Sequence, residues 1–195
     1  FVMINKKDTA EKVVNLEQSG RSDQNATSRP ARKGIYLLPN LLTTGALFAG
    51  FYAVLSGFSG QYEWAAMAIF AAMIFDGLDG RVARMTNTQS DFGVQYDSLS
   101  DMVSFGVAPA VVAYGWGVSS LGKLGLAAAF VYASCAALRL ARFNVQASSS
   151  DGKVFTGLPS PVAAALVAGF VWSFYDLSPS LWLSSLGAVI TAIAG

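Results

Sequence analysis

Four aspartates lie at the junction of two apolar stretches of the sequence. Asp76 and Asp79 close the first stretch, and Asp97 and Asp101 open the next. Spacings of three and four residues place the members of each pair on one helix face, so two antiparallel helices can present all four carboxylates to one volume. Oxygen ligands in this number suit Mg²⁺, Mn²⁺ or Ca²⁺, and shared carboxylates can bridge two ions about 3.5–4 Å apart. The pattern therefore predicts a cation site that binds phosphate oxygens.

The sequence contains no histidine, so acid–base chemistry falls to carboxylates. Gly80, Ala83 and Gly93 lie one or two turns from the aspartates, which leaves the helix surface bare for an elongated ligand. Arg84 follows on the same face and can neutralise a phosphate. Taken singly, the small residues are more often ordinary packing between membrane helices. Beside four aspartates, they favour a ligand site.

The elements that must position these residues are long apolar stretches. With 53% hydrophobic and 13% charged residues, the chain is too apolar for an ordinary soluble domain of 195 residues. Six stretches approach the roughly 20 residues that span a bilayer as a helix. They cover residues 35–57, 64–84, 102–122, 124–138, 154–175 and 177–195. We therefore predict an all-α integral membrane protein, with a six-helix transmembrane bundle in residues 35–195 and a polar juxtamembrane arm in residues 1–34.

Basic residues are distributed unevenly along the chain. Seven of the thirteen precede the first span, and alternation of the spans places Arg81, Arg84, Arg139, Arg142 and Lys153 on the same side. Under the positive-inside rule this side is cytoplasmic, so the aspartates face the cytoplasm. We expect a prokaryotic plasma membrane as the location and membrane lipids as partners. Because the chain starts at Phe1 and its last span reaches the final residue, we expect a fragment of a longer protein.

Eight of these residues match a known signature with every gap correct. Residues 76–101 resemble the D-x2-D-G-x2-A-R-x8-G-x3-D-x3-D motif of the CDP-alcohol phosphotransferases. The resemblance implies six transmembrane helices. It also implies transfer of a substituted phosphate from a CDP-linked donor to an alcohol, with release of CMP.

Further segments resemble the phosphatidylserine synthase branch of this family. They are residues 38–43, 97–109, 138–144 and 155–161, and Ser100 stands where that branch is expected to have alanine. The resemblance implies that CDP-diacylglycerol and L-serine give phosphatidylserine and CMP. It also suggests a homodimer.

The resemblance assigns roles to the residues of the signature. Asp76, Asp79 and Asp97 are expected to hold two ions, Mg²⁺ or Mn²⁺, with Asp101 a weaker ligand and the general base. The residues expected to contact the CDP group are Asn40, Thr43, Gly80, Ala83, Arg84 and Gly93.

Serine needs a cation for its carboxylate and an acceptor for its ammonium group. We assign this task to Arg139 and Arg142, with Ser104 and Asn144 nearby. An alternative interpretation makes both arginines topology and headgroup anchors.

Other functions remain open at this point. Glycerol 3-phosphate or an inositol phosphate could replace serine, although a phosphorylated acceptor would favour a denser basic pocket. Membrane prenyltransferases also bind diphosphate through aspartates, but spread over distant helices. An aspartate-lined cation transporter would favour carboxylates near the membrane midplane. The sequence shows no nucleic-acid signature.

Overall fold

A computed structural model describes residues 37–86, 90–148, 159–177 and 180–195, and every regular element within these ranges is helical. The elements form six rods: α2 (Leu37–Phe58), α3 (Tyr62–Thr86), a continuous rod of α4 (Asp91–Asp101), the π-helix η2 (Met102–Val107) and α5 (Ala108–Trp116), then α6 (Lys123–Ser148), α7 (Ser160–Phe174) and α8 (Leu181–Ala194). A short 3₁₀ turn, η3 (Val118–Leu121), precedes α6. Within the described residues, the six rods agree with the six predicted stretches.

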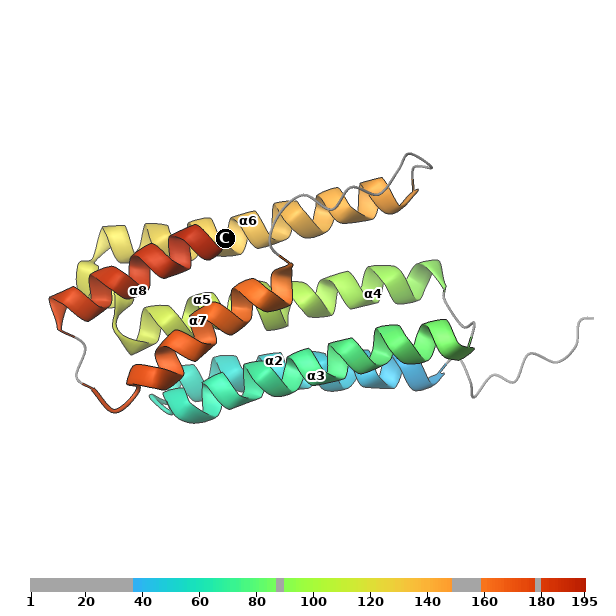
Figure 1. Cartoon of the computed structure of the whole chain (residues 1–195), viewed down its shortest axis with the longest axis horizontal. Coiled ribbons are helices and arrows are strands. Elements are labelled where there is room, and N and C mark those ends of the chain that lie inside the picture. Colours follow the sequence, from blue (N-terminus) through green and yellow to red (C-terminus); the bar gives the residue numbers. More distant parts are fainter. Residues whose placement is uncertain (1–36, 87–89, 149–158, 178–179) are drawn as a thin grey trace, which may run out of the picture. The chain divides into compact units, whose positions relative to one another are not determined.

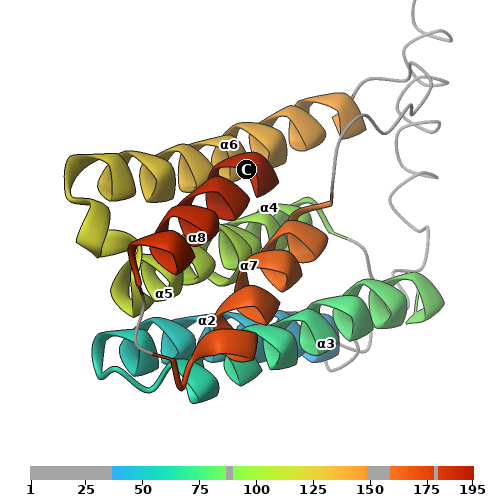
Figure 2. The same ribbon diagram turned by 60° about the vertical axis from the view of Figure 1, so that its left-hand side comes forward.

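The rods pack as layers (Figure 1). In both ribbon views α2 and α3 lie side by side, and the α4–α5 rod lies between this pair and α6 (Figure 2). The hairpin of α2 and α3 turns at Gly60, whose φ of 73° lies in the left-handed region that favours glycine. The chain therefore returns directly, and the aspartates of α3 come to lie beside the first half of α2.

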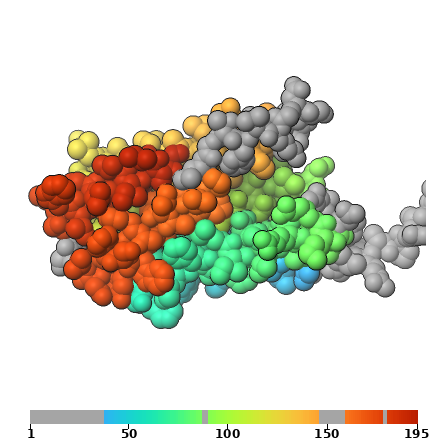
Figure 3. Space-filling model, viewed as in Figure 1, coloured from blue at the N-terminus to red at the C-terminus, as the bar shows by residue number. Residues whose placement is uncertain are grey.

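Helices α7 and α8 cover only part of this assembly. α7 begins at Ser160, with Pro161 in its first turn, near the middle of the long rods and runs toward the end that holds η3 (Figure 1). Figure 3 shows α7 and α8 packed over one half of the visible face, while the later part of α3 forms surface in the other half. Of the described residues, α7 and α8 thus cover less of the half that contains the ends of α3 and α6.

Small side chains dominate the contacts between the rods. Ala53, Ala65, Ala66 and Ala72 are fully buried, which lets the helix axes approach closely, as membrane helices commonly do. Gly50 illustrates the closeness, because a Cβ added there would lie 2.6 Å from Ser104 Cα. Tight packing of small residues therefore holds the α4–α5 rod against α2.

Many large apolar side chains point outward. Phe130, Trp182 and Ile193 are 70%, 85% and 80% exposed, far more than a soluble protein of this size tolerates over neighbouring helices. Two helices, Leu38–Phe58 and Lys123–Val145, are long and apolar enough to cross a membrane by themselves. The outer surface of α6 and α8 is therefore suited to lipid.

Two of the helical rods extend beyond the apolar stretches that predicted them. Helix α6 continues to Ser148, whereas the fourth apolar stretch ends at residue 138, and the third rod begins at Asp91, whereas the third apolar stretch begins at residue 102. The reason is that hydropathy marks only the apolar part of a helix, while backbone hydrogen bonds continue into polar sequence. The predicted arm (1–34) and the first residues of the fifth stretch lie outside the described residues.

Candidate functional site

Three of the four aspartates converge between α3 and α4. Asp76, Asp97 and Asp101 each offer one carboxylate oxygen, and these three atoms lie within 4.8 Å of one another. All three side chains are half-buried. Negative groups this close repel one another strongly where water is scarce, so a bound cation would stabilise the arrangement.

One carboxylate oxygen of the cluster has no hydrogen-bond partner among the described residues. Oδ1 of Asp97 is buried and, among the described residues, finds no hydrogen-bond donor. Leaving a buried anionic oxygen without a partner is costly, and a divalent ion that this oxygen coordinates would remove the cost. The residues present therefore fit a metal ion.

Asp79 is held differently from the other three. Its side chain is only 4% exposed, and Oδ2 accepts a 2.6 Å hydrogen bond from Oγ1 of Thr43 on α2. The Thr43 hydroxyl also lies 3.1 Å from the Pro39 carbonyl oxygen, a longer contact than the one to the charged carboxylate. Asp79 therefore lies outside the three-oxygen cluster and is oriented by the neighbouring helix.

The residues expected to contact CDP surround these aspartates. A Cβ added to Gly93 would lie 3.6 Å from Oδ1 of Asn40, so α2 and α4 bring these two residues together. Beside Asp79, a Cβ added to Gly80 would meet nothing within 4 Å in the described part of the chain. Arg84 is exposed, and its Nε donates to the Gly80 carbonyl at 2.9 Å. Ala83, one turn after Gly80, is half-buried. Helix α3 thus combines open space at Gly80 with the guanidinium of Arg84.

The start of α4 depends on a residue that the sequence analysis missed. Ser90 Oγ accepts a 3.0 Å hydrogen bond from the Gly93 amide, which caps the helix. A serine three residues before that amide is the usual signal of an N-cap and could have been recognised. Ser90 thereby fixes the beginning of the helix that carries Asp97 and Asp101.

The residues assigned to serine make separate contacts in the structure. Ser104 is fully buried and donates to the Ala46 carbonyl at 3.0 Å, a contact that accounts for it as helix packing. Arg139 Nε donates to Ser160 Oγ at 3.1 Å, which joins α6 to the first residue of α7. Arg142 lies exposed on α6, and Asn144 is half-buried.

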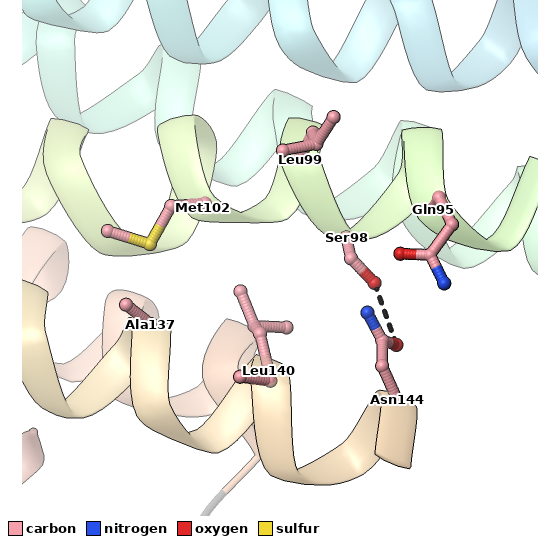
Figure 4. A pocket seen from close by; sticks show the side chains of 8 residues that line it. Gln95, Ser98, Leu99, Met102, Ala137, Leu140 and Asn144 are labelled. Atoms are coloured by element: carbon pink, nitrogen blue, oxygen red, sulfur yellow. Dashed lines mark hydrogen bonds between the residues drawn. The ribbon is translucent and has the colours of Figure 1, made fainter. Parts of the chain in front are cut away.

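A cleft of about 190 Å³ separates α4 from α6 (Figure 4). At its polar end, Ser98 Oγ donates to Oδ1 of Asn144 at 3.1 Å, and Gln95 lies beside them. Met102, Ala137 and Leu140 line its apolar end. Ser98 directly follows Asp97, so the bond places Asn144 close to the helix that carries Asp97 and Asp101. The sequence analysis did not identify this face of α4.

Known proteins provide an independent comparison. The sequence model described as CDP-alcohol phosphatidyltransferase matches residues 36–194. A CDP-diacylglycerol–serine O-phosphatidyltransferase of Helicobacter pylori (strain ATCC 700392 / 26695) is 44% identical over 133 residues, which are 68% of this chain and 56% of that protein.

Two archaeal proteins are similar as well. A protein of the same name from Methanocaldococcus jannaschii is 50% identical over 125 residues, 64% of this chain and 57% of the relative. An archaetidylserine synthase of Methanothermobacter thermautotrophicus is 40% identical over 142 residues, 71% of this chain and 60% of the relative. The chain thus matches little more than half of the length of these relatives.

Proposed function

The chain belongs to the CDP-alcohol phosphatidyltransferase family, and on that basis we propose that it catalyses phosphatidyl transfer from CDP-diacylglycerol to L-serine. The serine hydroxyl oxygen forms a bond to the phosphorus that carries diacylglycerol, and the bond from that phosphorus to the CMP oxygen breaks. The products are phosphatidylserine and CMP. The observation that carries the proposal is the convergence of Asp76, Asp97 and Asp101 at the spacing of the family signature.

The aspartates of the cluster, with Asp79 beside them, would hold two divalent ions, Mg²⁺ or Mn²⁺. Ions bound there would neutralise the diphosphate and the charge that develops on departing CMP. Asp97 is the ligand best supported by the structure, because its buried Oδ1 has no donor among the described residues. Asp79 would be a further ion ligand, and its hydrogen bond from Thr43 would orient its carboxylate.

Asp101 is the proposed general base. Its carboxylate belongs to the three-oxygen cluster. It shares a face of α4 with Asp97, which lies one turn before it. From there its carboxylate would accept the proton of the serine hydroxyl as the oxygen attacks phosphorus. Its place next to the proposed ion ligands keeps the nucleophile close to the phosphoryl group.

Donor binding falls to the residues around the aspartates. Asn40, Thr43, Ala83 and Gly93 would receive the cytidine and ribose, since the structure places Asn40 next to Gly93. The exposed space at Gly80 lets a ligand approach the backbone of α3, and the tethered Arg84 would contact phosphate.

Acceptor binding falls to α6. We assign the serine carboxylate to Arg139 or Arg142 and retain Asn144, which lies across the cleft from Ser98. For Ser104 we propose a packing role, through its hydrogen bond to the Ala46 carbonyl of α2, instead of serine binding. The names of the relatives support serine as the acceptor.

The setting of the reaction is also part of the proposal. The six rods would each span the membrane, with the aspartates on the cytoplasmic side where serine is dissolved, in the plasma membrane of a prokaryote and as a homodimer. Charge asymmetry, the outward apolar side chains and the bacterial and archaeal relatives support the membrane setting, whereas the homodimer rests on the family resemblance alone. The relative named archaetidylserine synthase favours one second candidate, the same reaction on an ether-linked liponucleotide.

An acceptor comparison tests the proposal. Purified protein in detergent receives CDP-diacylglycerol, Mg²⁺ and one alcohol at a time, namely L-serine, glycerol 3-phosphate or an inositol phosphate, and CMP is quantified. We expect CMP release with serine well above release with the other two. Equal or greater release with a phosphorylated alcohol would replace the acceptor, and no release with any alcohol on ester or ether donor would contradict the activity.

A further inference from the structure

The rod that carries Asp97 and Asp101 changes its helical pattern directly after Asp101. In η2 the Ala108 amide donates to the Val103 carbonyl, five residues back instead of four. Residue 109 is a proline, which has no N–H to donate. The Phe105 carbonyl oxygen therefore lacks the donor that a regular α-helix would supply.

Tyr132 on α6 supplies the missing donor. Its hydroxyl donates to the Phe105 carbonyl at 2.8 Å, and both side chains are fully buried. A buried carbonyl without a partner is costly, so this bond stabilises the π-helical segment beside the proline. Tyr132 thus contacts the backbone one turn beyond Asp101.

The π-helix determines which face of the rod meets α2. Before it, Ser100 Oγ donates to the Thr43 carbonyl at 3.2 Å. After it, Val112 packs on Gly57, where an added Cβ would lie 3.1 Å from the valine Cγ2. In a regular α-helix at 3.6 residues per turn, positions 100 and 112 would point about a third of a turn apart. The extra residue of a π turn rotates the later part back by roughly that angle.

We propose that Tyr132 is a positioning residue for the aspartate cluster. Its hydroxyl holds η2 in the π form, and η2 keeps α5 packed on α2 while Asp97 and Asp101 face α3. Tyr132 touches neither substrate nor ion. The proposal rests on the proposed function only in that the aspartates bind divalent ions.

The test uses Tyr132→Phe, which removes the hydroxyl alone. Mn²⁺ binding to the protein without substrate is measured by electron paramagnetic resonance, so that no turnover is needed. We expect the affinity for Mn²⁺ to fall about 3- to 10-fold, at or below the range for residues that contact ligands directly. Thermal unfolding is recorded beside it, since a hydroxyl with only a structural role would change stability and leave Mn²⁺ affinity unaltered.

Tyr62 provides a matched control. Its hydroxyl donates to the Gly115 carbonyl at 2.7 Å, also between a tyrosine and the backbone of the α4–α5 rod, but far along the rod from Asp101. Tyr62→Phe is expected to bind Mn²⁺ like the native protein. Equal Mn²⁺ affinity of the Tyr132→Phe and Tyr62→Phe proteins would overturn the proposal.

A second variant tests the cause. Pro109→Ala restores an N–H that can donate to the Phe105 carbonyl, so Tyr132→Phe should reduce Mn²⁺ affinity less in that background than in the native one. The same reduction in both backgrounds would contradict the proposal. Failure of the proposed function would appear differently, as native protein that binds Mn²⁺ yet releases no CMP.

Discussion

The hydroxyl of Thr43 donates a 2.6 Å hydrogen bond to Oδ2 of Asp79, and each side chain is only 4% exposed. This bond joins α2 to the helix that carries the first aspartate pair. The sequence pattern assigned Thr43 to CDP binding, and the structure adds that Thr43 determines the orientation of Asp79. A residue that orients a ligand influences metal affinity even without touching the ion.

Thr43→Val should therefore impair the enzyme while preserving the side-chain shape. We expect activity at limiting Mg²⁺ to fall about 10- to 100-fold, because Asp79 loses the donor that orients it. Activity is measured as CMP release over a range of Mg²⁺ concentrations. Thr43→Ser keeps the hydroxyl and should retain most activity.

The control for this change is Thr44→Val. Thr44 is exposed, and its hydroxyl bonds to the Tyr96 hydroxyl at 2.9 Å and to the Asn40 carbonyl at 2.7 Å instead of to a carboxylate. Equal activities of the Thr43→Val and Thr44→Val proteins at every Mg²⁺ concentration would show that Asp79 does not depend on Thr43.

Asp101→Asn tests the assignment of the base. An amide cannot accept the serine proton, so kcat should fall about 10²- to 10⁴-fold and should stay low at saturating Mg²⁺ or Mn²⁺. Asp91→Asn, on the exposed first turn of the same helix, should leave kcat unchanged. Near-native kcat of Asp101→Asn with saturating metal would remove Asp101 from the role of base.

Arg142→Ala tests serine recognition with the least structural disturbance. Arg142 is exposed on α6, whereas Arg139 is bonded to Ser160 and its removal would also loosen the start of α7. If Arg142 binds the serine carboxylate, KM for serine should rise about 10-fold or more while KM for CDP-diacylglycerol changes little, since a charge-assisted bond is lost. A change in expression level with both KM values intact would instead assign Arg142 to topology.

Gly50→Ala tests the close packing of α2 on the α4–α5 rod. The added Cβ would lie 2.6 Å from Ser104 Cα, so the helices must move apart at a cost of about 1–3 kcal/mol. The expected result is a lower apparent unfolding temperature in detergent. Gly77→Ala is the comparison, because a Cβ there meets nothing within 4 Å among the described residues, and it should be neutral or slightly stabilising. Equal unfolding temperatures would contradict the packing described here.

The sequence was sufficient to predict the six helical rods and the shared helix face of Asp97 and Asp101, because hydrophobic length and residue spacing are local properties. It did not predict the separation of Asp79 from the other three, since that depends on Thr43 of a different helix. The burial of Ser104 against Ala46 was missed for a related reason. The direction of the Ser104 side chain follows from packing between two helices and from the π-helix. Residue spacing indicates neither of these.

The full extent of α6 and the role of Tyr132 were also beyond the sequence analysis. Helix α6 continues past the apolar part, where hydropathy gives no signal. Tyr132 lies 27 residues from Phe105 in sequence, and nothing local connects them. The proline at position 109 does predict an unsatisfied carbonyl four residues earlier, but only the tertiary structure identifies its donor.

The central claim is that the aspartates support metal-dependent transfer to serine. The most direct test incubates purified protein with radiolabelled L-serine and CDP-diacylglycerol, and measures labelled lipid and CMP with Mg²⁺, with chelator, and after Mn²⁺ is added back. The account predicts labelled phosphatidylserine and CMP in equal amounts with Mg²⁺, neither with chelator, and recovery with Mn²⁺. Full formation of labelled lipid in chelator, or CMP release without incorporation of serine, would contradict it.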